Sequence, residues 1–235
     1  MIKQAIVLAG GFGTRLQKVV QDTPKPMAPI NGRPFLEYQL NYLRQQGINK
    51  IVFSVGYLSE QIQNYFGNEF NGIDIKYAVE KLPLGTGGAI KYALDFITAK
   101  EALVVNGDTL FEISLSDFYE KHSSKNSDFS LALRTVDEVN RYGSVSIDDE
   151  NKIIKFAEKG CSHGKGFING GVYIINKRFF ENFYFPLKFS LEIDVFEHYY
   201  TKTAFYGFAY KNYFLDIGIP QDYNIAQNDF IKLNY

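Results

Sequence analysis

Glycines, an arginine and a lysine stand together near the start of the chain in a pattern suited to binding phosphate. The apolar run at residues 5–8 leads into a glycine-rich stretch at 10–13, and Arg15 and Lys25 follow. Glycines let the backbone approach a ligand closely, and successive N–H groups in such a turn bind anions. Arg15 offers a planar fork for phosphate, and flanking prolines hold Lys25 on a stiff segment. We predict a polyphosphate site here, with a purely structural turn as the alternative.

Two better-known phosphate-binding motifs do not fit this chain. The dinucleotide fingerprint G-x-G-x-x-G begins at Gly11, but Leu16 stands where its third glycine belongs, and no acidic residue ends the next predicted strand, 51–55. A Walker loop needs four residues between its first glycine and its Gly-Lys pair, whereas three separate Gly160 from Gly164. Hydride transfer and P-loop hydrolysis are therefore disfavoured.

Two aspartates stand at the ends of apolar runs. Asp108 lies just beyond the run 102–105, and Asp216 ends a second run at residues 213–216. Open α/β sheets bind ligands outside the carboxyl ends of their strands, and carboxylate oxygens can hold a divalent cation. Asp108 is therefore a candidate metal ligand, and a cap for the segment that follows it is the alternative.

The glycine loop and the lysine segment together resemble a family signature. Residues 10–16 read Gly-Gly-Phe-Gly-Thr-Arg-Leu and residues 24–27 read Pro-Lys-Pro-Met, as in the sugar-1-phosphate nucleotidylyltransferases. The resemblance implies that Asp108 and Asp216 together hold one catalytic Mg²⁺ ion. It assigns the nucleotide to Leu8, Ala9, Gly10, Gly11, Gly13, Thr14, Arg15, Lys25, Glu80, Gly85, Thr86, Asn106 and Gly107.

A second glycine-rich segment, residues 80–89, resembles the part of this family that reads the base. Its sequence is Glu-Lys-Leu-Pro-Leu-Gly-Thr-Gly-Gly-Ala, so that Glu80 precedes the glycines. Guanine presents adjacent N1–H and N2–H₂ donors that one carboxylate can accept together, whereas thymine and uracil need a group that also donates. Glu80 is therefore expected to select GTP. A carboxylate that caps the following helix start is the alternative.

Further matches fall where relatives bind the sugar phosphate. Residues 156–159 resemble an F-x-E-K pattern, and residues 168–173 resemble an I-N-x-G-x-Y strand. Two departures are Gly160, where relatives usually have proline, and residues 214–215, where many have a tryptophan nearby. The resemblance assigns the sugar phosphate to Tyr142, Gly143, Glu158, Lys159, Asn169, Gly170 and Glu192.

The activity that the resemblance implies is transfer of a nucleoside monophosphate to a sugar 1-phosphate. The sugar phosphate, placed by Lys159, would attack the α-phosphorus in line. Lys25 would neutralise the α-phosphate, and Arg15 the leaving pyrophosphate. A phosphate monoester has a second pKa of about 6, so the nucleophile is largely ionised at neutral pH and needs no general base. The histidines of the chain match no role: His122, His163 and His198.

The end of the chain narrows the resemblance further. Residues 216–223, Asp-Ile-Gly-Ile-Pro-Gln-Asp-Tyr, and the short length are similar to the D-glycero-D-manno-heptose 1-phosphate guanylyltransferases of this family. GTP and D-glycero-alpha-D-manno-heptose 1-phosphate are thus the expected substrates. A mannose- or glucose-1-phosphate nucleotidylyltransferase is the nearest alternative. From another class, the chain could be a non-catalytic sensor of nucleotide sugars.

Alternating strands and helices must position these residues. Apolar periodicity predicts strands at 51–55, 73–79 and 102–105, with helices at 34–46, 59–66 and 87–97. This alternation predicts an α/β fold, a Rossmann-like doubly wound, mostly parallel sheet. Later strands, with a helix near 190–200, predict a β-rich elaboration of the same domain. The resemblance implies that this part binds the sugar, in a fold of the nucleotide-diphospho-sugar transferase type. We expect one domain, 1–235, with a nucleotide-binding core (about 1–136), the elaboration (about 137–212) and a return strand with a C-terminal helix (213–235).

Composition excludes several classes of protein. The 235 residues carry a formal net charge of -1, which gives no overall field for nucleic acid or an anionic membrane. No apolar run approaches the roughly 18 residues of a membrane span, and the first residues leave no room for a signal peptide. One cysteine, Cys161, excludes an internal disulfide and supplies no metal-ligand set. We expect a cytoplasmic monomer or homodimer whose partners are small molecules.

Overall fold

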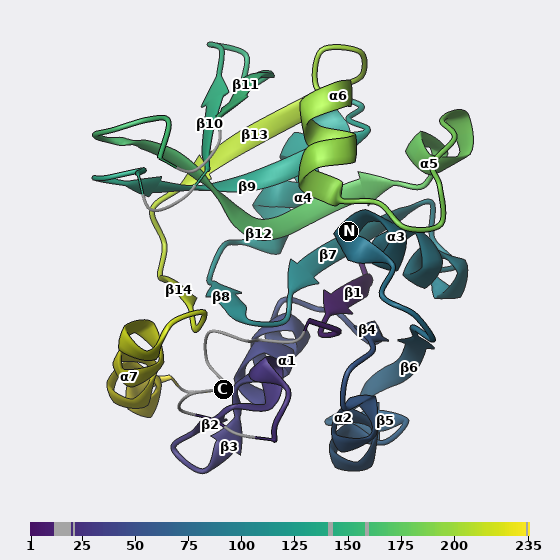
Figure 1. Cartoon of the computed structure of the whole chain (residues 1–235), viewed down its shortest axis with the longest axis vertical. Coiled ribbons are helices and arrows are strands. Elements are labelled where there is room, and N and C mark those ends of the chain that lie inside the picture. The colour runs from purple at the N-terminus through teal and green to yellow at the C-terminus, as the bar shows by residue number, and fades with distance from the viewer. Residues whose placement is uncertain (12–19, 21, 141–142, 158–159, 234) are drawn as a thin grey trace.

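The computed structural model of this chain describes residues 1–11, 20, 22–140, 143–157, 160–233 and 235. Within them, a ten-stranded sheet is made of β1 (Gln4–Leu8), β4 (Lys50–Val55), β5 (Glu69–Phe70), β6 (Ile73–Val79), β7 (Glu101–Asn106), β9 (Phe129–Val136), β10 (Ser144–Ile147), β11 (Ile153–Ala157), β12 (Gly166–Asn176) and β13 (Phe205–Tyr210). Its main path follows the order β11-β10-β12-β7-β1-β4-β6-β5 (Figure 1). Strand β9 joins by pairing with β12, and β13 joins by pairing with β9.

Strand β1 lies at the centre of a parallel group, between β4 and β7, with β6 beyond β4. Residues 5–7 are fully buried, as expected for a strand that is covered on both faces. The three central strands end level with one another, because Leu8 lies opposite both Ser54 of β4 and Asn106 of β7. Their carboxyl ends therefore meet at one edge of the sheet, where α/β folds bind ligands.

Helices cover both faces of this parallel group. On one face lie α1 (Phe35–Gln45), α2 (Ser59–Phe66) and α4 (Leu115–Ser124), and on the other lies α3 (Gly85–Ala93), continued by the 3₁₀ turn η2 (Leu94–Phe96). Val7 and Phe53 belong to the core cluster of the first face, whereas Ile6 and Val52 belong to that of the second. Successive side chains of a strand point to opposite faces, which explains this division. The predicted doubly wound α/β fold is confirmed.

Strand β12 separates the parallel group from a mostly antiparallel group, which lies above the parallel group in Figure 1 and in which only β9 and β13 pair in parallel among the described strands. It runs antiparallel to β7, β9 and β10, and β10 pairs in turn with β11. Aromatic rings fill the core of this part, where Phe129 lies 5.0 Å from Phe179 and 4.8 Å from Phe205 between ring centroids. The covering elements are α5 (Arg178–Asn182), the π-helical η3 (Leu191–Phe196) and α6 (Glu197–Tyr199). The single helix predicted near 190–200 is thus divided into a π-helical and an α-helical part.

Two short strand pairs complete the fold. β8 (Thr109–Phe111) runs antiparallel to β14 (Phe214–Asp216), with Thr109 opposite Asp216. β2 (Pro29–Ile30) pairs with β3 (Arg33–Pro34) shortly after the 3₁₀ turn η1 (Lys25–Met27). Figure 1 shows β14 leading from the antiparallel group to α7 (Pro220–Asp229), which continues into η4 (Phe230–Lys232). The β8–β14 pair matters for the site, because it joins two parts of the chain that are distant in sequence.

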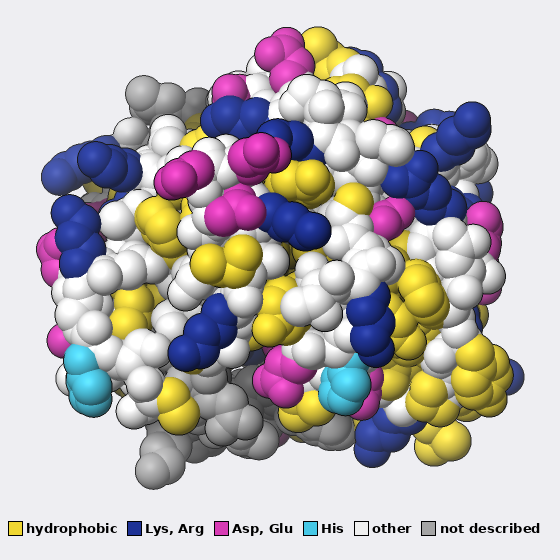
Figure 2. Space-filling model, turned by 90° about the horizontal axis from the view of Figure 1, so that it is seen from above, with side chains coloured by type: hydrophobic (Ala, Val, Ile, Leu, Met, Phe, Trp, Pro, Cys, Tyr) yellow, Lys and Arg dark blue, Asp and Glu magenta, His cyan; other side chains and the backbone are white. Residues whose placement is uncertain are grey.

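Charged side chains of both signs are mixed over the face shown in Figure 2. This agrees with the formal net charge of -1, and an anionic substrate must therefore be met by local cations rather than by a broad positive field. In the described part of the chain, no helix combines the length and the apolar character needed to cross a membrane. The domain limits expected from the sequence stay predictions.

Candidate active site

A cleft of about 340 Å³ opens at the carboxyl ends of β1, β4 and β7. Leu8, Ser54 and Asn106, which are neighbours across these strands, form part of its wall. The start of α3 and one residue of η3 form other parts. The lining residues are Leu8, Gly10, Gly11, Ser54, Glu80, Pro83, Gly85, Thr86, Ala89, Asn106, Asp108 and Glu192.

Most of this wall was predicted from the sequence. Pro83 and Ala89 belong to the predicted segment 80–89 but were not named as site residues. Ser54 was missed, and its signal is a polar residue near the end of an otherwise apolar strand. Among the described residues, the predicted site residues that do not line the cleft are Ala9, Lys25, Gly107, Gly143, Asn169, Gly170 and Asp216. The predicted residues that lie outside the described part of the chain are Gly13, Thr14, Arg15, Tyr142, Glu158 and Lys159.

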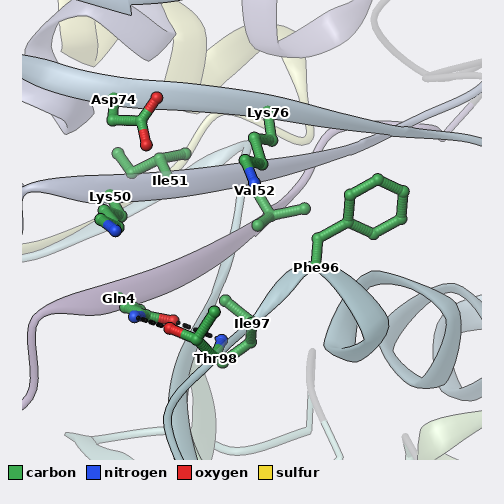
Figure 3. A pocket seen from close by; sticks show the side chains of 9 residues that line it. All are labelled: Gln4, Lys50, Ile51, Val52, Asp74, Lys76, Phe96, Ile97 and Thr98. Carbon is green, nitrogen blue, oxygen red and sulfur yellow. Dashed lines mark hydrogen bonds between the residues drawn. The ribbon is translucent and has the colours of Figure 1, made fainter.

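Three further hollows that the described residues line lie at the opposite, amino ends of the parallel strands. The one in Figure 3 has a volume of about 30 Å³, which suits a water molecule but not a nucleotide. The Gln4 side chain in this hollow already has hydrogen-bond partners within the protein. It donates to the Thr98 hydroxyl at 2.7 Å and accepts from the Thr98 N–H at 2.9 Å. The other two, of about 430 and 370 Å³, are larger than the cleft. The cleft is nevertheless the expected place for a ligand, because open α/β sheets bind ligands at the carboxyl ends of their strands.

Close backbone packing holds the cleft wall together behind β1. The Gly107 N–H donates a hydrogen bond of 2.9 Å to the Leu8 carbonyl oxygen, and a Cβ at Gly107 would lie 2.7 Å from that oxygen. A Cβ at Gly10 would lie 3.1 Å from Oε1 of Glu80 and 3.2 Å from the backbone nitrogen of Gly56. Glycine is therefore required at Gly107 and favoured at Gly10, so that the chain can pass between its neighbours.

A buried glutamine positions the turn that carries Asp108. Gln39 of α1 is 2% exposed, and its Nε2 donates to the carbonyl oxygens of Asn106 at 2.8 Å and Thr109 at 2.6 Å. These bonds hold both ends of the turn against α1, on the face of the sheet that α1, α2 and α4 cover. Gln39 is not among the residues predicted from the sequence, and its signal is an uncharged polar side chain on the apolar face of a helix.

The glycines at the start of α3 are needed for close packing against the segment around Phe189. Gly85 has φ +73°, and a Cβ there would lie 2.5 Å from the carbonyl oxygen of Phe189. The Gly87 N–H donates to that same oxygen at 3.1 Å. Beside them, the Thr86 hydroxyl donates to Oε2 of Glu192 at 2.7 Å, which joins α3 to η3 across the cleft wall. These glycines are therefore needed for the packing against Phe189, and Gly85 and Thr86 also line the cleft.

Glu80 follows β6 and lines the cleft, and its carboxylate accepts two hydrogen bonds from the protein. Its Oε1 accepts a hydrogen bond from the Ser54 hydroxyl at 3.3 Å, and its Oε2 accepts one from the Leu84 N–H at 2.9 Å. A carboxylate has about four acceptor sites, so that two protein donors leave capacity for a ligand. The capping alternative and a role in base recognition are thus compatible.

Lys25 joins the two predicted metal ligands at the edge of the cleft. Its Nζ donates hydrogen bonds to Oδ2 of Asp108 and to Oδ1 of Asp216, the latter at 3.3 Å. The pairing of β8 with β14 brings the carboxylates together, because Asp108 directly precedes Thr109, which lies opposite Asp216. The Gly218 N–H donates a further hydrogen bond of 2.7 Å to Oδ1 of Asp216.

The two carboxylates that accept from Lys25 could also hold a metal cation. Burial raises the pKa of Asp216 and the charge of Asp108 raises it further, whereas Lys25 and the Gly218 N–H lower it. Within the described residues, no group of three or more His, Cys, Asp or Glu side chains could hold a metal ion. Mg²⁺, however, is usually bound through one or two carboxylates together with substrate phosphates. Asp108 and Asp216 fit such an ion.

Of the predicted sugar-phosphate residues that the structure describes, Glu192 lines the cleft and the others do not. The Asn169 amide is used within its own strand, where Nδ2 donates to the Tyr173 hydroxyl at 2.8 Å. Gly170 packs against Phe111, and a Cβ there would lie 2.5 Å from its ring. The sugar-phosphate assignment stays a prediction.

Known proteins match this chain over nearly its whole length. The family model described as nucleotidyl transferase matches residues 4–232. The chain is 49% identical over 226 residues to the D-glycero-alpha-D-manno-heptose 1-phosphate guanylyltransferase of Aneurinibacillus thermoaerophilus, with 96% of this chain and 97% of the relative covered. It is 46% identical over 220 residues to the protein of the same name from Campylobacter jejuni, with 94% and 96% covered.

A solved structure matches as well. The crystal structure of HddC from Yersinia pseudotuberculosis complexed with GMP-PN has a TM-score of 0.86 and 41% sequence identity, and the match covers 97% of this chain and 100% of that one. The family match includes every residue of the cleft wall, from Leu8 to Glu192.

Proposed function

The chain belongs to the nucleotidyl transferase family, and we propose that it transfers GMP from GTP to D-glycero-alpha-D-manno-heptose 1-phosphate. Two relatives of nearly equal length carry the name of that activity, and the HddC structure is complexed with GMP-PN. The products would be a GDP-activated heptose and pyrophosphate. This proposal keeps the substrates that are expected from the sequence.

One observation of the structure supports the chemistry most directly. Asp108 and Asp216 converge on Lys25 beside a cleft of about 340 Å³. The two carboxylates would hold a Mg²⁺ ion, which supplies charge neutralisation at phosphate oxygens. Lys25 would contribute a further positive charge at the α-phosphate.

The reaction then depends on positioning and charge rather than on proton transfer. An oxygen of the sugar phosphate forms a bond to the α-phosphorus, and the bond from that phosphorus to the β-phosphate oxygen breaks in line with it. The nucleophile is largely ionised at neutral pH, because the second pKa of a phosphate monoester is about 6. Lys159 would place the attacking phosphate and Arg15 would neutralise the leaving pyrophosphate, in parts of the chain outside the described residues.

The remaining assignments belong to the same proposal. Glu80 would accept both donors of the guanine edge, and Glu192 would accept from hydroxyl groups of the sugar. Asn169 and the other predicted sugar-phosphate residues are retained as candidates. We propose that the chain works as one domain in the cytoplasm, as a monomer or a homodimer.

A substrate screen tests the proposal. Pyrophosphate release is measured for GTP, UTP, dTTP and ATP, each with heptose, mannose or glucose 1-phosphate. We expect the highest kcat/KM for GTP with D-glycero-alpha-D-manno-heptose 1-phosphate. A preference for mannose 1-phosphate would reject the sugar assignment and keep the guanylyl assignment. Binding of nucleotide sugars without turnover of any pair would favour a sensor.

A further inference from the structure

An ammonium group stands where the two carboxylates converge. Lys25 Nζ contacts Oδ2 of Asp108 and lies 3.3 Å from Oδ1 of Asp216. The Lys25 side chain is 10% exposed, whereas those of Asp108 and Asp216 are 30% and 35% exposed. The lysine therefore meets the pair from its buried side, and each carboxylate keeps a part that is open to solvent.

The backbone on both sides holds this arrangement in place. The prolines that flank Lys25 restrict its segment, and the Ala28 N–H donates to the Lys25 carbonyl oxygen at 3.0 Å. On the other side, the Gly218 N–H holds Oδ1 of Asp216 at 2.7 Å. A Cβ at Gly218 would lie 2.9 Å from that oxygen and 3.1 Å from Lys25 Nζ. Glycine thus leaves the room that the ion pair needs.

We propose that Lys25 is an internal counter-cation of the metal site, which neutralises Asp108 and Asp216 until a metal–nucleotide complex arrives. The inference rests on the proposed function, which assigns a divalent cation to the same carboxylates. A divalent cation that binds this pair without nucleotide is repelled by the adjacent ammonium group. When a triphosphate is bound as well, its negative oxygens give Lys25 a new partner and release the carboxylates.

Metal and nucleotide binding are therefore coupled. The free enzyme has a low affinity for divalent cations, because Lys25 competes for their ligands. If bound nucleotide raises the affinity for the metal by some factor, bound metal must raise the affinity for the nucleotide by the same factor, because the coupling is reciprocal. Lys25 thus links the two binding steps in addition to carrying charge in the reaction.

The test measures binding of Mn²⁺ alone, without nucleotide, by electron paramagnetic resonance. Lys25→Met keeps most of the side-chain length and removes the charge, and Lys25→Gln is a second neutral variant should the first fold poorly. We expect both variants to bind Mn²⁺ about tenfold or more tightly than the wild type. Adding Asp108→Asn to Lys25→Met should abolish the gain, because it removes a ligand.

Lys76→Met is the matched control. Lys76 is exposed on β6, beside the hollow at the opposite end of the sheet (Figure 3), so the variant loses the same charge without touching the pair. We expect its Mn²⁺ affinity to equal that of the wild type. Unchanged or weaker Mn²⁺ binding by the Lys25 variants overturns the inference, as does an equal gain in Lys76→Met. Turnover that survives excess chelator would instead reject the metal part of the proposed function.

Discussion

The backbone N–H of Leu84 donates a hydrogen bond of 2.9 Å to Oε2 of Glu80, across the turn that joins β6 to α3. A carboxylate at the start of a helix is stabilised by the unpaired N–H groups and the positive end of the helix dipole. The Ser54 hydroxyl fixes the other oxygen, Oε1, at 3.3 Å. One bond at the start of α3 and one from β4 therefore hold the carboxylate in place at the cleft wall.

Glu80→Gln should weaken the preference for GTP. An amide cannot accept from both the N1–H and the N2–H₂ group of guanine, and its own NH₂ group would face one of these donors. We expect discrimination in favour of GTP to fall by about 1–3 kcal/mol, the scale of a good bidentate contact to a base. The measurement is kcat/KM for GTP, UTP, dTTP and ATP with both proteins.

Ser54→Ala is the control for this experiment, because it removes one hydrogen bond to Glu80 and leaves the carboxylate. Its base preference should stay close to that of the wild type. If Glu80→Gln lowers the midpoint temperature of thermal unfolding but keeps the full preference for GTP, Glu80 stabilises the start of α3 and does not read the base.

Asp108→Asn should lower kcat by about a hundredfold or more, while stability changes little. The amide keeps the size of the side chain and an oxygen for Lys25, but it removes the negative charge that a divalent cation needs. Excess chelator should abolish turnover of the wild type, and added Mg²⁺ should restore it. Asp117→Asn is the control, because Asp117 pairs with Lys121 on α4. Undiminished turnover in excess chelator would contradict the metal mechanism.

His122 should make the stability of the protein depend on pH without taking part in catalysis. The side chain is fully buried, and Nδ1 lies 2.8 Å from the Ser130 hydroxyl. Burial lowers the pKa of His122 and Arg178 lowers it further, whereas Glu101 and Asp128 raise it. Below its ordinary pKa of 6.5 the unfolded chain binds a proton that the folded chain does not.

The free energy of unfolding should therefore fall as the pH drops below about 6.5, by at most about 1.4 kcal/mol per pH unit from this group. His122→Gln should lack this part of the fall and keep kcat within about tenfold of the wild type. Urea unfolding between about pH 5 and pH 8 measures the first effect, and pyrophosphate release measures the second. Parallel stability profiles for the two proteins would contradict the burial argument.

Gly85→Ala should destabilise the protein more than Gly32→Ala. Both glycines have a positive φ, of +73° and +82°, which costs about 1–2 kcal/mol for any residue with a Cβ. At Gly32 no atom lies within 4 Å of the added Cβ, whereas at Gly85 the Phe189 carbonyl oxygen would lie 2.5 Å away. The difference between their free energies of unfolding isolates the steric part. Equal losses would show that residues near Phe189 move aside freely.

Local patterns in the sequence determined the elements and the types of chemistry. The helix predicted at 59–66 and the strand predicted at 73–79 have the same bounds in the structure. Apolar spacing and caps act over a few residues, so that a single sequence carries this information. The same holds for the family signature at residues 10–27, which indicated a nucleotidyltransferase before any fold was known.

Tertiary structure decided which of these residues meet. Lys25 and Asp216 lie 191 positions apart in the chain, and the pairing of β8 with β14 at the edge of the cleft brings Asp216 next to Asp108. The order of the strands depends on contacts between distant segments, which apolar periodicity does not encode. For the same reason, the sequence predicted a glycine-rich helix start but could not show that Phe189 requires glycine there.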